Sequence, residues 1–210
     1  EMTSSLVGSE MCIRDSCRHL SFGQNEVKQD EIIQVGNEKF LKTTMRFTLG
    51  YSNQTNKWID APYLQFRDGT PLGEDDYDEY DLKSVQSTFD QAIRATFTKD
   101  EMSNLKNNPP AQMTFYYVVS PEGETIETAF IIPRKSAVLA DLPPEKYALL
   151  EKNLKKYLRW TVNDFGKRMK FLHAWRIVDF PTMKITYPVF PPTTGVVGSL
   201  PAKEETIKLP

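Results

Sequence analysis

The sequence predicts an α+β fold, in which an antiparallel sheet built from several hairpins carries two main helices packed on one face. Three observations predict it. Residues 112–132 alternate apolar and polar side chains on both sides of a Pro–Glu–Gly turn, as a β-hairpin does. Residues 82–97 place apolar side chains at helical spacing, and a second helical stripe follows Pro143 and Pro144.

The first sixteen residues fit neither a strand nor a helix. Reverse translation of residues 6–15 resembles a transposase-type sequencing adapter read as though it were gene. We therefore expect residues 1–16 to be a non-native scar, with a genuine disordered N-terminus as the alternative. Cys12 would belong to this scar and Cys17 to its junction, so we expect neither a disulfide nor thiol chemistry in the body of the chain.

Residues 28–190 are expected to form a single α+β domain, followed by a loose tail at 191–210 that is rich in Pro, Gly and Thr. A hydrophobic content of 40% and an aromatic content of 11% support a real core. The formal charge of −2 argues against nucleic acid as a partner. No stretch approaches the roughly 18 apolar residues that a membrane span needs, so we predict no span.

The N-terminal part of this domain, residues 28–72, predicts a β-meander. Gly36 and Asn37 separate two candidate strands, the polar residues 51–56 form a turn, and residues 58–66 resume the strand pattern before Asp68 and Gly69. The apolar faces come from Phe40, Met45, Phe47 and Leu49.

An acidic run follows and allows two interpretations. Clustered carboxylates are what calcium prefers, but their spacing does not fit an EF-hand loop. We favour a solvated loop whose last member, Asp81, caps the next helix. The six acids are Glu74, Asp75, Asp76, Asp78, Glu79 and Asp81.

Two helices are expected next. The first covers residues 82–97, because one apolar stripe runs along it. Thr98 and Glu101 then have the spacing of a capping box, which predicts a second helix over 99–107. The stripe of the first helix consists of Leu82, Val85, Phe89, Ile93 and Phe97.

The hairpin is the clearest passage of the sequence. Pro121 presets φ for a type I turn, and Gly123 supplies the left-handed conformation that a following bulge needs. A long helix opening at Pro143 and Pro144 comes after it, and residues 170–180 and 183–190 predict two further strands. The core stripe of this helix consists of Tyr147, Leu150, Leu154, Tyr157 and Leu158, with Glu145, Lys152, Lys155, Lys156 and Arg159 facing outward.

The passages YYVVSPEGETIETAFI, LPPEKYALLEKNLKKYLRW and KFLHAWRIVDF together resemble the C-terminal domain of TonB and its relatives. More narrowly, they are similar to uncharacterised exported proteins of Bacteroidetes-type bacteria. The resemblance covers residues 111–190. It implies a hairpin–helix–strand unit and an envelope location, either periplasmic or secreted.

The sequence contains no G-x-G-x-x-G, P-loop, H-E-x-x-H, C-x-x-C or G-x-S-x-G motif. Of the two histidines, His19 lies beside the scar and His173 lies in a predicted strand, where we expect a hydrogen-bonded structural role. Trp58, Trp160 and Trp175 could line a ligand cleft, but we expect them in the core. We therefore assign no catalytic, cofactor-binding or metal-binding residue.

The favoured hypothesis is a non-enzymatic envelope protein that acts by binding or scaffolding. Its partner would be a protein that adds a strand to an exposed sheet edge, where backbone hydrogen bonds supply affinity. The alternative is a carboxylate-dependent hydrolase acting on glycans, which would use members of the acidic run at 74–81.

Overall fold

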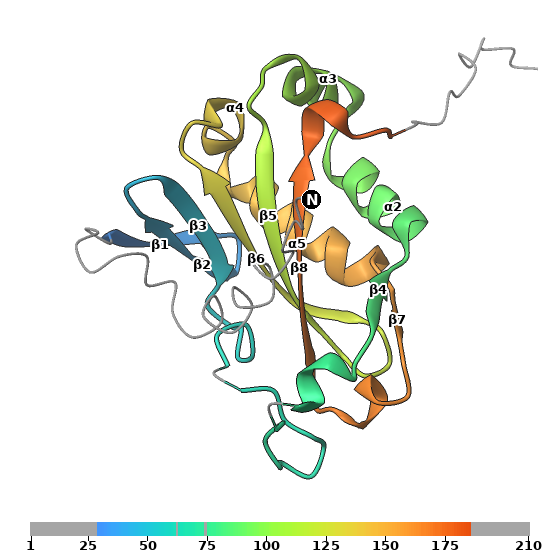
Figure 1. Ribbon diagram of the computed structural model, residues 1–210. Helices are drawn as coiled ribbons and strands as arrows, with labels where there is room; N and C mark the ends of the chain where they lie inside the picture. The colour runs from blue at the N-terminus through green and yellow to red at the C-terminus, as the bar shows by residue number, and fades with distance from the viewer. Residues whose placement is uncertain (1–28, 62, 74, 186–210) are drawn as a thin grey trace, which may run out of the picture.

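Figure 1 shows the computed structural model of the protein, which describes residues 29–61, 63–73 and 75–185. Its centre is a six-stranded sheet in the order β1-β2-β3-β6-β5-β8, with every neighbouring pair antiparallel. With helices on one face of this sheet, the predicted α+β class is confirmed. The proposed scar at 1–16 and the tail at 191–210 lie outside the described residues. The strands are β1 (Gln29–Val35), β2 (Glu38–Thr44), β3 (Thr48–Asn53), β5 (Gln112–Val119), β6 (Thr125–Pro133) and β8 (Leu172–Asp179).

The N-terminal meander forms, but with other boundaries than predicted. Gly36 turns β1 into β2 with φ +57°, as its place between the strands indicated. The predicted turn at 51–56 is wrong in its first half, because β3 extends to Asn53 and pairs with β6. The predicted strand at 58–66 is also wrong: the described residues of this segment form a loop, with isolated bridges at Gln65 and Phe66.

The predicted hairpin is confirmed as β5 and β6. Gly123 has φ +85°, and its N–H donates to Ser120 O at 2.9 Å across the turn. The register shifts between Val118 and Val119, which is the bulge expected after such a turn. The side chain that Gly123 lacks would also meet a neighbour, because a Cβ there would lie 2.2 Å from Trp160 O.

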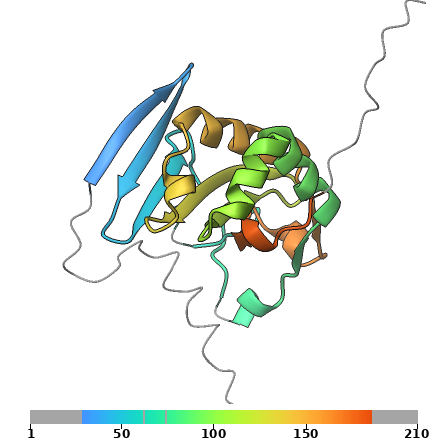
Figure 2. The same ribbon diagram turned by 90° about the horizontal axis from the view of Figure 1, so that it is seen from above.

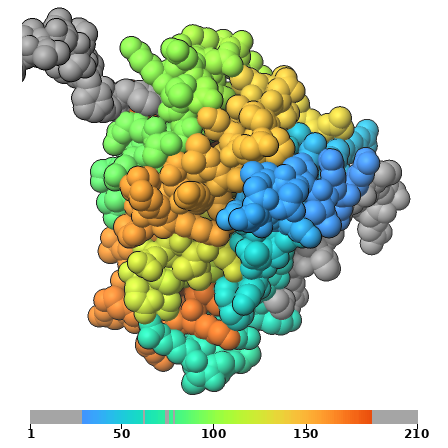
Figure 3. Space-filling view, turned by 180° about the vertical axis from the view of Figure 1, so that it is seen from behind, coloured from blue at the N-terminus to red at the C-terminus, as the bar shows by residue number. Residues whose placement is uncertain are grey.

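In the part of the chain that the structure describes, four α-helices accompany the sheet: α2 (Gln86–Thr96), α3 (Lys99–Asn107), α4 (Ala137–Ala140) and α5 (Pro144–Tyr157). The capping box of α3 is present at Thr98 and Glu101, and Pro144 opens α5, as predicted. The back view in Figure 3 shows α2, α3 and α5 covering one side of the molecule. Seen from above in Figure 2, β1 and β2 extend beyond this helical layer.

The core lies between the helices and one face of the sheet. Phe89 of α2 packs edge-on against Phe115 of β5, with 5.8 Å between ring centroids. Tyr147 of α5 stacks on Tyr51 of β3 at 4.2 Å. All four rings are buried, so helix and strand stripes join in one apolar cluster. We call this side of the sheet the helix face and its opposite the open face.

Three boundaries differ from prediction near the ends of elements. Residues 82–84 form a short strand, β4 (Leu82–Ser84), which pairs with β7 (Trp160–Val162). The helix therefore starts at Gln86, and Asp81 does not cap it: the N-cap position is Val85. After β8 the chain forms a 3-10 helix at Phe180–Thr182, so residues 183–185 do not form the predicted strand, and 186–190 lie outside the described residues.

Candidate functional site

The open face consists of cross-strand rows that run through all six strands. Cα pairing places Ile32, Leu41, Ser52, Ala129, Tyr116 and Trp175 in one row. The next row contains Asp30, Thr43, Gly50, Ile131, Thr114 and Ile177. The first row has the small side chains of Ser52 and Ala129 in its middle, and the second has Gly50 beside Ile131. Each row ends in a large apolar side chain on β8. Figure 1 is viewed toward this face, with α5 behind the sheet.

Strand β8 forms one edge of the sheet and is the most apolar part of the open face. Trp175 and Ile177 are each 53% exposed, although both are large hydrophobic residues. Trp175 was predicted to be in the core, and this prediction is wrong, because its side of β8 has no helix packed on it. Alternate residues of an edge strand direct their N–H and C=O groups away from the sheet. Among the described residues, no backbone–backbone hydrogen bond is found along the outer edge of β8.

Arg176 lies between these two residues and faces the helices. Its guanidinium lies over the Phe89 ring, 4.1 Å from the centroid, and Nη2 donates to Gln86 Oε1 at 2.8 Å. Its Nη1 is buried and has no hydrogen-bond partner in the described part of the chain. Arg176 also forms no ion pair with a described acidic side chain. No acidic side chain of the described residues therefore neutralises its positive charge at ion-pair distance.

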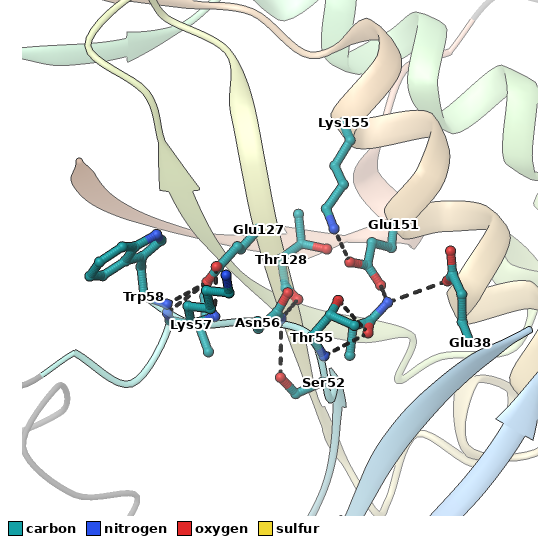
Figure 4. Close-up of polar contacts among 12 residues, drawn as sticks. Glu38, Ser52, Thr55, Asn56, Lys57, Trp58, Glu127, Thr128, Glu151 and Lys155 are labelled. Atoms are coloured by element: carbon teal, nitrogen blue, oxygen red, sulfur yellow. Dashed lines mark hydrogen bonds and ion pairs between the residues drawn. The ribbon is translucent and has the colours of Figure 1, made fainter. Parts of the chain in front are cut away.

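A buried carboxylate fixes the loop after β3 against the open face. Glu127 of β6 is 7% exposed and accepts three backbone N–H bonds, from Lys57 at 2.7 Å and from Trp58 and Ile59 at 2.8 Å. Figure 4 shows the loop wrapped around this side chain. Three donors satisfy the carboxylate in a buried setting, so the loop cannot leave without exposing or orphaning it.

His173 holds the same loop from β8. Its Nε2 lies 2.8 Å from Trp58 O, so the expected hydrogen bond is present. Burial lowers the pKa of His173, while the charges of Glu127 and Asp60 act in the opposite direction. Trp58 stacks on Phe171 at 4.9 Å. Of the three tryptophans, Trp58 and Trp160 pack against the core as predicted.

A second polar group lies behind the loop, on the helix face. Asn53 Oδ1 accepts from the Thr55 N–H at 3.0 Å, and its Nδ2 lies 3.4 Å from Glu151 of α5. Burial raises the pKa of Glu151, which is 2% exposed, and the ion pair with Lys155 opposes that shift. The contacts of Asn53 come from Glu38 of β2, Thr55 of the loop and Glu151 of α5, and Figure 4 shows these three side chains close together. These contacts attach α5 to the meander.

The acidic run does not converge on a site within the described residues. Asp76 Oδ2 accepts from the Gly73 N–H at 2.8 Å, Glu79 is exposed, and Asp81 pairs with Lys83 at 2.6 Å. Glu74 and the side chains of Asp75 and Asp78 lie outside what the structure describes. No group of three or more metal-ligating side chains is found in the described part. No helix there is long and apolar enough to cross a membrane.

Sequence reasoning missed Glu127 and Arg176. Each sits in an otherwise apolar strand pattern, TIETAFII and AWRIV, which was the available signal. A charged residue in such a strand either points to solvent or needs a buried partner. Glu127 accepts hydrogen bonds from the loop, whereas Arg176 stacks on the Phe89 ring and donates to the neutral amide of Gln86.

No family model and no curated protein matches the chain. Among solved structures, it is similar to the crystal structure of a DUF5043 family protein from Bacteroides uniformis. The TM-score is 0.58 and the sequence identity is 18%, over 80% of this chain and 93% of that chain. At this identity the likeness concerns the fold, so the α+β architecture described above is one that this chain shares with that protein.

Proposed function

We propose that the protein is a non-enzymatic binding or scaffolding module of the cell envelope, which takes up a partner strand at the free edge of β8. The observation that carries the proposal is the exposure of Trp175 and Ile177 side by side on the open face of an edge strand. In strand addition, backbone hydrogen bonds provide affinity and side-chain contacts on alternate residues provide specificity.

Natural edge strands are protected by proline, by charged side chains such as lysine, by an inward-pointing charge, by a bulge or by a covering segment. Of these devices, β8 has an inward-pointing charge, Arg176. Strand β8, LHAWRIVD, contains neither proline nor lysine, and its pairing with β5 runs without a break from Leu172 to Asp179. Exposed apolar side chains beside such an edge favour association with another chain. A partner strand would cover Trp175 and Ile177 from the side.

The other edge strand is less suited to this role. In β1 the open face presents Asp30, Ile32 and Gln34, so a single large apolar residue stands among polar ones. Gln34 uses its amide locally, donating to Gly36 O at 2.7 Å. We therefore place strand addition at β8.

The proposed envelope location rests on a sequence resemblance alone. The sequence of residues 111–190 resembles the TonB C-terminal domain and exported proteins of Bacteroidetes-type bacteria. The similar solved structure comes from Bacteroides uniformis and supplies the fold. Export itself is tested by fractionating cells that express the full-length gene and locating the protein with an antibody.

Binding is tested by selecting random nine-residue peptides on the immobilised protein. We expect the selected peptides to alternate apolar residues and to bind as extended strands. Methylating alternate backbone amides should abolish their binding, because it removes ladder hydrogen bonds. Trp175→Ala should weaken binding at least several-fold. Phe47→Ala is the matched control, since Phe47 is 64% exposed but lies between β2 and β3.

The proposal fails if no peptide is enriched. It also fails if the enriched peptides bind equally well to the parent and to Trp175→Ala, or if methylated peptides bind as well as unmodified ones.

A further inference from the structure

We propose that the strand that β8 accepts carries an acidic residue between two apolar residues, placed opposite Ile177, Arg176 and Trp175. This inference rests on the proposed strand addition and specifies the chemistry of the partner. It follows from the two faces of β8 and from the charge state of Arg176.

The two faces of β8 favour different side chains on the added strand. Trp175 and Ile177 have Tyr116 and Thr114 as their Cα partners and belong to the open face. Arg176 has Phe115 as its partner and belongs to the helix face. Because side chains alternate along a strand, an added strand must present residues to both faces in turn. Two apolar residues would then flank one residue on the Arg176 side.

Arg176 favours an acidic residue at that middle position. Its guanidinium bonds to Gln86, a neutral side chain, and leaves Nη1 buried without a hydrogen-bond partner in the described chain. The nearest acid in this network is one step away, where Gln86 Nε2 donates to Asp90 Oδ1 at 2.6 Å. A partly buried cation of this kind attracts a carboxylate more strongly than a solvated surface charge does.

The geometry of antiparallel pairing brings the two charges together. Residues directly opposite each other on neighbouring strands have Cβ atoms about 4.5–5.5 Å apart. A glutamate opposite Arg176 would therefore reach the guanidinium once the arginine side chain turns from the Phe89 ring toward the strand edge, because Nη1 is buried in this structure. A lysine there would place like charges opposite each other and be rejected. The expected recognition pattern is apolar–acidic–apolar.

The test uses three nine-residue peptides that differ only in the central residue: Ile-Glu-Ile, Ile-Gln-Ile and Ile-Lys-Ile in a common Thr/Val framework. Fluorescence anisotropy with the unmodified protein gives each Kd. We expect the Glu peptide to bind about 3- to 10-fold more tightly than the Gln peptide, and the Lys peptide to bind weakest. The difference should shrink at high salt, because screening weakens charge pairing.

A variant series assigns the preference to one residue. Arg176→Gln should remove the difference between the Glu and Gln peptides, while Arg46→Gln, on the turn between β2 and β3, should preserve it. If Arg176→Gln does not fold, the peptide series on the unmodified protein still decides the question. Equal affinity for the three peptides overturns this inference and leaves strand addition standing. If none of the three binds and no random peptide is enriched, strand addition itself is overturned.

Discussion

The buried hydroxyl of Tyr117 allows a direct test of how polar groups contribute to this core. Tyr117 is 1% exposed, and its Oη has no hydrogen-bond partner among the described residues. Burial raises its pKa, so the phenol is neutral at physiological pH. Tyr117→Phe removes this oxygen and keeps the ring, which packs edge-on against Trp160 with 5.1 Å between centroids.

The expected change in the free energy of unfolding follows from the desolvation of one hydroxyl. Burying a hydroxyl without a hydrogen bond destabilises a protein by about 1–3 kcal/mol. Tyr117→Phe should therefore stabilise the fold by about 1–2 kcal/mol. For a chain of this length, that corresponds to a rise in Tm of roughly 2–8 °C.

Tyr147→Phe is the matched control. Tyr147 is also 1% exposed, but its hydroxyl donates to Leu139 O. Removing that hydroxyl removes one hydrogen bond from the core, although Leu139 O keeps the bond from the Leu142 N–H at 3.1 Å, and should destabilise the fold by about 1 kcal/mol. Urea titrations of the parent and both variants measure the two effects. If Tyr117→Phe destabilises the protein as much as Tyr147→Phe does, the Tyr117 hydroxyl has a partner and the reasoning is wrong.

Three further predictions concern the turn, the loop contact and the caps. Gly123→Ala should destabilise the fold by at least about 2 kcal/mol, because φ is +85° and a Cβ would lie 2.2 Å from Trp160 O. Gly36→Ala is the control: a Cβ at Gly36 meets no atom, so this variant should cost only about 1 kcal/mol. Equal urea midpoints for the two variants would contradict the prediction. Because burial lowers the pKa of His173 below 6.5, the unfolded state binds more protons than the folded state when the pH falls below 6.5. The contribution of His173 to the free energy of unfolding is therefore complete above pH 6.5 and declines as the pH falls below that value. Urea midpoints of the parent and of His173→Gln between pH 8 and 5 should converge on acidification, and a widening gap would refute it. Thr98→Ala should lower the free energy of unfolding by about 0.5–2 kcal/mol, because it removes the capping box of α3. Asp81→Ala loses one exposed ion pair and should change the free energy of unfolding by less than about 0.5 kcal/mol. If Asp81→Ala lowers Tm more than Thr98→Ala does, Asp81 is a helix cap after all.

Elements whose signals are local could be predicted from the sequence. The hairpin turn depends on Pro121 and Gly123, the start of α3 on Thr98 and Glu101, and the start of α5 on Pro144. In each case the determining residues are neighbours along the chain, so their chemistry acts whatever the rest of the fold does. All of these features are present in the structure.

Features that depend on distant partners could not be predicted. Leu82 matches the helical stripe, yet it pairs with Val162 in a strand, because β7 provides a ladder that the local pattern does not reveal. Residues 58–61 look like the start of a strand but lie in a loop that is held by Glu127, from a strand far along the chain. Trp175 has a core-like pattern but lies on the face that no helix covers. The candidate site on β8 depends on this uncovered face. The sequence therefore predicted strand addition at a sheet edge but could not indicate which edge.

The pairing of β3 with β6 divides the sheet into two sets of three strands. Two consecutive hairpins join β1, β2 and β3, whereas the other set combines the β5–β6 hairpin with β8, which pairs with β5 across the segment that contains α5. We call this β3–β6 junction the seam. Its strands are farther apart in the sequence than those of any other strand pair in the sheet, so forming it closes the longest loop and costs the most chain entropy. Two contacts lie next to the seam and stabilise it: Glu127 of β6 holds the loop after β3, and Asn53 of β3 contacts Glu151 of α5. A chain that opens at this seam keeps two partly ordered halves, each with a newly exposed strand edge. The same backbone chemistry that suits β8 to a partner would then let the halves of two molecules exchange, so removing the Glu127 or Asn53 contacts should favour strand-exchanged dimers.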